Sequence, residues 1–170
     1  MDLLRPLLHS FMELALHQGL LPEPHAQNVL FIQVARAGGT GWTPVWRDLL
    51  GFYCDSVRRA ELGLGGSESI PVRRRLADVV QAQRTRSVLF DHMLYEYLVG
   101  PLLLVARQYG ADDLFLLDEC RRTLNTWLRE APDYLPEGSW FSRSLEPAMP
   151  GEWLIEQRRH GWPMIRGGYK

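Results

Sequence analysis

Apolar residues recur at helical spacing along most of the chain. In residues 3–20 the large apolar side chains fall on one face of a helical wheel, and Gly19 and Pro22 follow as stop signals. A second stripe begins at Thr43-Pro44, a cap residue followed by a first-turn proline, and continues to Leu64. The pattern then predicts helices over 71–99, 102–109 and 113–130, with a break or kink at Gly100-Pro101.

Residues 28–35 fit two structures. The run Val-Leu-Phe-Ile-Gln-Val at 29–34 is typical of a buried strand. Pro24 is well placed as a first helical residue, and Gly38-Gly39 is well placed as a helix end. We favour a helix here and keep the strand as the alternative.

The predicted fold class is all-α. Five to six helices joined by short turns that contain glycine and proline indicate a single helical bundle over residues 1–131. Its centre is predicted at residues 88–99, because apolar side chains there cover nearly every direction around the helix. Leu94 is therefore expected to be a core residue.

The chain changes character in residues 132–170. Five of the 11 prolines and three of the 6 tryptophans lie there, and only residues 151–160 have the pattern of a short helix. A segment that carries several aromatic residues is not typical of a flexible tail. We expect an irregular C-terminal extension with Trp140 and Trp153 buried and with Trp162 in a subunit contact, which makes these three tryptophans candidate partner-binding residues.

Composition indicates an ordinary globular domain. Of the 170 residues, 46% are hydrophobic and 23% charged, and the formal net charge of −1 argues against polyanion binding by the chain as a whole. Cys54 and Cys120 both lie in apolar patterns, so they are expected to be buried free thiols in a reducing, cytoplasmic compartment. The first residues do not have the pattern of a signal peptide, and the apolar runs are too short to span a membrane.

Two histidine–acid sets have the spacing of metal ligands. His9, Glu13 and His17 follow one another at intervals of four, but they fall opposite the apolar stripe of their helix, where they would face solvent. His92 and Glu96 lie in the apolar helix and are expected to form a hydrogen-bonded pair in the core. We therefore predict neither a metal nor a cofactor.

Arginines supply the remaining candidate sites. Arg86 and His92 match the loose spacing found in helical ribonucleases of the HEPN class, although roughly 1.6 such matches are expected by chance in this composition. Taken as one helix, the segment that follows Pro71 would carry five arginines on and around the flanks of its apolar stripe. We favour solvated and ion-paired side chains for them and keep a nucleic-acid surface as the alternative: Arg73, Arg74, Arg75, Arg84 and Arg86.

Nothing in the sequence demands an enzyme. Lys170 is the only lysine among 19 basic residues, and both arginine and the aromatic residues are enriched at protein interfaces. We therefore expect a non-enzymatic interaction protein, an adaptor or a structural subunit that binds another protein or its own copies. A nucleic-acid-associated helical subunit is the first alternative, and a HEPN-like ribonuclease is the second.

Overall fold

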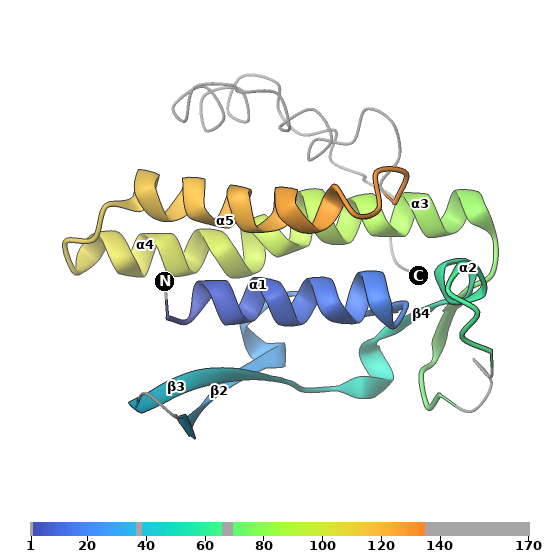
Figure 1. Ribbon diagram of the computed structural model, residues 1–170, viewed down its shortest axis with the longest axis horizontal. Coiled ribbons are helices and arrows are strands. Elements are labelled where there is room, and N and C mark those ends of the chain that lie inside the picture. Colours follow the sequence, from blue (N-terminus) through green and yellow to red (C-terminus); the bar gives the residue numbers. More distant parts are fainter. Residues whose placement is uncertain (1, 37–38, 66–69, 135–170) are drawn as a thin grey trace.

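Three helical rods lie above a β-hairpin in the computed structural model, which describes residues 2–36, 39–65 and 70–134 (Figure 1). The first rod is α1 (Leu4–Met12), extended by the π-helical turn η1 (Glu13–His17). The second is one long helix made of α3 (Val79–Ser87), the π-helical segment η5 (Val88–Val99) and α4 (Gly100–Gln108). The third, α5 (Asp113–Leu128), runs parallel to α1 and antiparallel to the long helix.

Two small sheets complete the described fold. β1 (Leu20–Leu21), β4 (Tyr53–Asp55) and β5 (Arg74–Leu76) form a three-stranded sheet in which β4 lies in the middle, antiparallel to β1 and parallel to β5. The short helix α2 (Ser56–Glu61) follows β4 directly. The 3₁₀ turns η2 (Ala26–Asn28) and η3 (Leu49–Gly51) flank the second sheet, an antiparallel hairpin of β2 (Val29–Arg36) and β3 (Gly39–Trp46).

The all-α expectation, and with it the helical-bundle description, is wrong. Residues 29–36 form β2, so the strand that was the alternative for 28–35 is correct and the favoured helix is wrong. The helix predicted from Thr43 to Leu64 is replaced by the rest of β3, η3, β4 and α2. Short apolar runs satisfy the periods of both a helix and a strand, so long-range pairing decides between them. The segment that follows Pro71 likewise begins with β5 and becomes helical only at Val79.

Gly100-Pro101 does not break the long helix. The helix changes there from the wider π geometry to α geometry, and Pro101 lies in the first turn of α4, next to this change.

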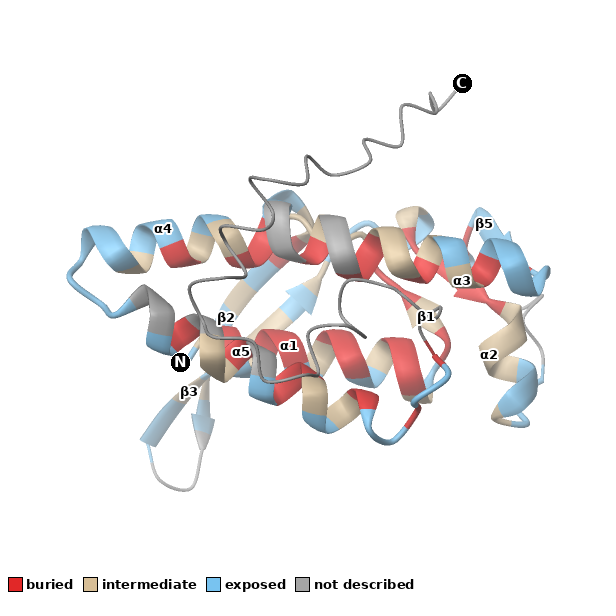
Figure 2. Ribbon diagram, turned by 90° about the horizontal axis from the view of Figure 1, so that it is seen from above, coloured by how far each residue is buried: buried red, intermediate tan, exposed pale blue. Residues whose placement is uncertain are grey.

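The π-helical segment η5 supplies the centre of the core. Its buried residues recur at intervals of four to five, as expected when hydrogen bonds join residues five apart (Figure 2). Leu94 is fully buried, as predicted, whereas Tyr97 is 48% exposed. Among the residues of this segment whose side chains the structure describes, the buried ones are Leu89, Phe90, Leu94, Leu98 and Val99.

Truncating the side chain at the centre of this segment should be costly. Leu94→Ala is expected to lower the free energy of unfolding by about 2–5 kcal/mol, because it opens a cavity at a site with no solvent access. The matched control is Leu104→Ala on α4, where the side chain is 68% exposed, and its cost should stay below about 1 kcal/mol. Chemical denaturation of the two variants measures both values, and equal losses would contradict the central position of Leu94.

Candidate interaction surface

The inner face of the β2–β3 hairpin is anchored to α1. The indole N–H of Trp46 donates a hydrogen bond of 2.8 Å to the hydroxyl of Ser10, and its ring lies 5.9 Å from that of Phe11. Val29 is buried in the main core, and Phe31 packs against it. These contacts fix the hairpin as a rigid platform beneath α1 (Figure 1).

The outer face of the hairpin is apolar and exposed. Leu30 pairs with Val45 across the strands, and Ile32 pairs with Thr43, so these side chains share one face. Leu30, Ile32 and Val45 are 48%, 46% and 38% exposed. Several contiguous, exposed apolar side chains are typical of an interaction surface.

The two edges of the hairpin differ. The amide of Arg47 donates to the carbonyl of Asn28, which identifies these two residues as a hydrogen-bonded pair at the base of the ladder. Because such pairs alternate with non-hydrogen-bonded ones, the backbone of Val29, Phe31, Gln33 and Ala35 points away from β3. Within the described residues no third strand pairs with either edge.

Pro44 hinders the pairing of a further strand at the β3 edge only. It pairs with Phe31 at a non-hydrogen-bonded position, so the N–H that proline lacks is one that would have pointed outward. β2 contains no proline and no charged residue between Val29 and Ala35, so its edge is the one able to accept another strand.

A buried ion pair holds the three-stranded sheet against the long helix. Asp55 and Arg86 are 0% and 3% exposed, and the guanidinium donates to both carboxylate oxygens at 2.6 and 3.1 Å. A third bond of 3.0 Å runs from Arg86 to the carbonyl of Tyr134, whose ring lies 4.4 Å below the guanidinium carbon. Burial alone would lower the pKa of Arg86, but the hydrogen bonds and charge of Asp55 outweigh burial and raise it.

The five candidate nucleic-acid arginines do not form one helical surface. Arg73, Arg74 and Arg75 lie on and beside β5, whereas Arg84 and Arg86 lie on α3. Arg86 is buried, so it is not available to a nucleic acid or to an open catalytic cleft.

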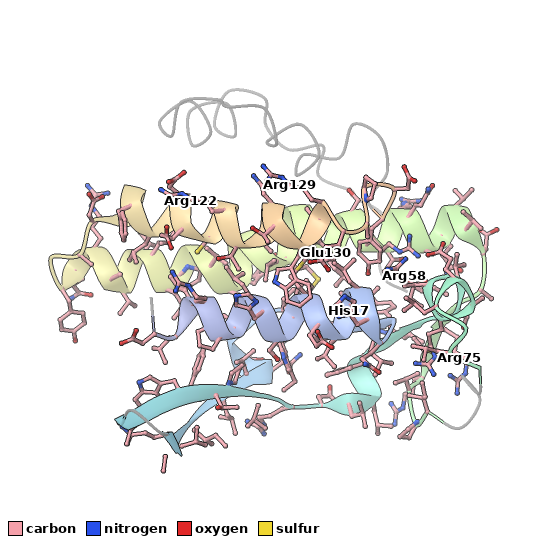
Figure 3. All side chains as sticks on the ribbon, viewed as in Figure 1. His17, Arg58, Arg75, Arg122, Arg129 and Glu130 are labelled. Carbon is pink, nitrogen blue, oxygen red and sulfur yellow. The ribbon has the colours of Figure 1, made fainter. Side chains whose placement is uncertain are left out.

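The β5 arginines are engaged with neighbouring groups. Arg74 pairs with Glu23 and donates to the hydroxyl of Tyr53 at 2.7 Å. Arg75, labelled in Figure 3, donates to the carbonyl of Ile70 at 3.0 Å. These contacts fit the interpretation of solvated and paired side chains better than that of a continuous basic face.

His9 on α1 and Glu13 in η1 are exposed, as predicted, whereas His17 is half-buried, and both histidines contact Trp127 of α5. The indole of Trp127 donates to the ring of His9 at 2.9 Å and stands 5.2 Å from the ring of His17. His17 faces Glu13 at 2.9 Å and Glu130, just beyond the end of α5, at 3.6 Å (Figure 3). Among the described residues no group of three or more acid, histidine or cysteine side chains is placed to hold a metal ion.

Other candidate residues lie outside what the structure describes. The side chains of His92 and Glu96 are not described, so their expected pairing is untested. Trp140, Trp153 and Trp162 lie beyond the described residues. Cys54 and Cys120 are buried free thiols, as predicted. None of the helices in the described part of the chain combines the length and apolar character needed to cross a membrane.

Neither the hairpin surface nor Asp55 was among the residues predicted from the sequence. A Gly-Gly pair between two runs rich in β-branched and aromatic residues is a hairpin signature, and Gly38-Gly39 is such a pair. Asp55 follows an apolar run and accepts the amide of Arg58 as the N-cap of α2, which is the usual signature of a strand leading into a helix.

Comparisons with protein-family models, with curated proteins and with solved structures found no match to this chain. Functional argument therefore depends on the surface and on the buried groups alone.

Removing one member of the buried pair should destabilise the fold strongly. Arg86→Met is expected to cost about 3–5 kcal/mol, because it leaves the Asp55 carboxylate buried and unpaired. The double variant Asp55→Asn/Arg86→Met should recover part of that loss. The matched control is Arg122→Met in the exposed Asp118–Arg122 pair, which should cost less than about 1 kcal/mol. Equal costs in chemical denaturation would contradict the role of the Asp55–Arg86 pair.

Stability should fall at alkaline pH. Burial raises the pKa of the Cys120 thiol from 9.0 to about 12, and burial followed by the charge of Asp55 also raises the pKa of Tyr134. The folded state therefore keeps protons that the unfolded chain releases, so stability is full below pH 9 and is lost between about pH 9 and 12. Thermal melts should show this decline, and Cys120→Ala should make it shallower. A decline of unchanged steepness in Cys120→Ala would contradict the assignment.

Proposed function

We propose that the chain is a non-enzymatic interaction subunit that docks onto a protein partner through the outer face of its β-hairpin. The observation that carries this proposal is the group of exposed apolar side chains Leu30, Ile32 and Val45 on a hairpin whose other face is anchored to α1. A rigid apolar platform loses little conformational entropy on binding, which favours association.

Two buried ionisable groups are held in their usual protonation states, which suits a structural role. Burial raises the pKa of the Cys120 thiol to about 12, and at Arg86 the hydrogen bonds and charge of Asp55 outweigh burial and raise the pKa of the guanidinium. A buried, protonated thiol is a poor nucleophile.

A charge on the outer face should abolish docking. We expect Val45→Glu to weaken capture of the partner by at least about tenfold, because the carboxylate would be desolvated in an apolar contact. Affinity capture by the full chain from its native host, with quantitative mass spectrometry, measures the loss. Circular dichroism and a thermal melt confirm that the variant is folded.

Leu104→Glu is the matched control, since this α4 side chain is apolar, exposed and distant in sequence from the hairpin. It should keep the same partner. Retention of every partner by Val45→Glu would refute docking through the hairpin, and loss in Leu104→Glu alone would move the interface to α4.

A further inference from the structure

We propose that the open edge of β2 pairs antiparallel with β2 of a second copy of this chain, so that two hairpins form one four-stranded sheet about a two-fold axis at Ile32. This inference rests on the proposed function, because both use the hairpin, and it names one partner and its mode of binding.

The backbone of β2 offers the required groups. The residues at positions 29, 31, 33 and 35 direct their backbone N–H and C=O groups away from β3, and no described strand takes them. From Val29 to Ala35 the edge lacks the devices that natural sheets use against pairing, which are proline, charged residues and bulges, and Arg36 at its end is the one charged residue of β2. β3 has Pro44 on its own outer edge, so the geometry selects β2.

The alternation of hydrogen bonds restricts the register. Outward-pointing residues must lie opposite outward-pointing residues, so a two-fold axis has to pass through a residue of β2 rather than between two residues. For the central part of the strand, the choices are Phe31, Ile32 and Gln33.

The side-chain pattern favours the axis at Ile32. Positions 28, 30, 32, 34 and 36 read polar, apolar, apolar, apolar and polar, a sequence that is the same in both directions. With the axis at Ile32, Leu30 lies opposite Val34 of the second copy, and Ile32 lies opposite itself. Such cross-strand apolar pairs stabilise a sheet.

The position of Arg36, the charged residue of β2, is consistent with the same register. An axis at Ile32 places Arg36 opposite the uncharged polar Asn28, whereas an axis at Gln33 would place it opposite Leu30. An axis at Phe31 would place Asn28 opposite Val34. The central register is therefore the only one of the three that matches polar with polar and apolar with apolar residues along this face.

The hairpin is held to α1 mainly through β3, so the pairing edge lies on the strand farther from that anchor. A single strand edge is a small interface, and small interfaces form weak, concentration-dependent complexes. We expect a dimer with a dissociation constant on the order of 10–1,000 µM.

Sedimentation equilibrium of the full chain over a concentration series tests strand pairing. Gln33→Pro removes one outward N–H from β2 and should raise the dissociation constant at least about tenfold. The matched control is Thr40→Pro on β3, which also removes an outward N–H. Both changes remove the side-chain hydrogen bond of 3.1 Å between Gln33 and Thr40. They therefore differ only in the edge that loses an N–H, which is β2 for Gln33→Pro and β3 for Thr40→Pro. A monomeric wild-type chain, or equal weakening by both prolines, would overturn the proposal.

Cysteine cross-linking tests the register. Two copies of Ile32→Cys would face each other at a non-hydrogen-bonded position, about 4.5 Å apart between Cα atoms, which is within disulfide range. Copies of Leu30→Cys would be displaced by four residues, about 13 Å along the strands. The native Cys54 and Cys120 are buried and do not compete. Oxidation should link Ile32→Cys and leave Leu30→Cys unlinked, and equal yields or no link in either variant would overturn the proposed axis.

These results separate the two proposals. If the wild-type chain is monomeric while Val45→Glu still loses its captured partner, strand pairing is refuted and docking through the hairpin stands. If the chain dimerises as described while Val45→Glu keeps every other captured protein, the second copy is the only partner of the hairpin and the inference is supported.

Discussion

The buried ion pair between Asp55 and Arg86 is the constraint on which the arrangement of the described elements depends. Two charges at 0% and 3% exposure persist only when hydrogen bonds satisfy them, and besides the two bonds between them the pair bonds to two further segments. The carboxylate caps α2 and binds α3, while the guanidinium also binds the carbonyl of Tyr134 beyond α5. The amide of Asp55 donates to the carbonyl of Gly19. Position 19 favours glycine because its φ is +60° and a Cβ added there would lie only 2.5 Å from Cγ of Arg59.

The β2–β3 hairpin is a separate two-stranded sheet with two different faces. A two-stranded hairpin is marginal on its own, so the contacts of Val29, Phe31 and Trp46 on the inner face are what support it. The outer face adds nothing to that core, because its side chains are directed away from α1. Burial in the core therefore does not explain leucine, isoleucine and valine at the exposed positions 30, 32 and 45.

The long helical stripes could be predicted from sequence, since α1, α5 and most of the long helix have enough turns for their period to be read. Apolar periodicity alone did not decide the hairpin, because eight-residue runs fit both periods and the deciding hydrogen bonds join β2 to a strand outside the run. The one local signal for it was the Gly38-Gly39 pair between the two runs. The predicted arginine surface over residues 73–86 was wrong, because a helical wheel at 100° per residue assumes one continuous helix. The segment instead begins with β5 and becomes helical only at Val79. Arg86 and Asp55 are 31 residues apart, and no local pattern predicts that they meet.

The difference between the two hairpin edges is the part of the surface that simple packing does not explain. If the hairpin only covered α1, polar β-formers would serve on its outer face, and Thr43 shows that this face accepts one. An apolar, uncharged edge carries a real cost, because it invites pairing with other chains. β3 avoids that cost with Pro44, whereas β2, in the same hairpin and equally without a third strand among the described residues, does not. An edge left open beside one that is closed is most simply understood as an edge that is used.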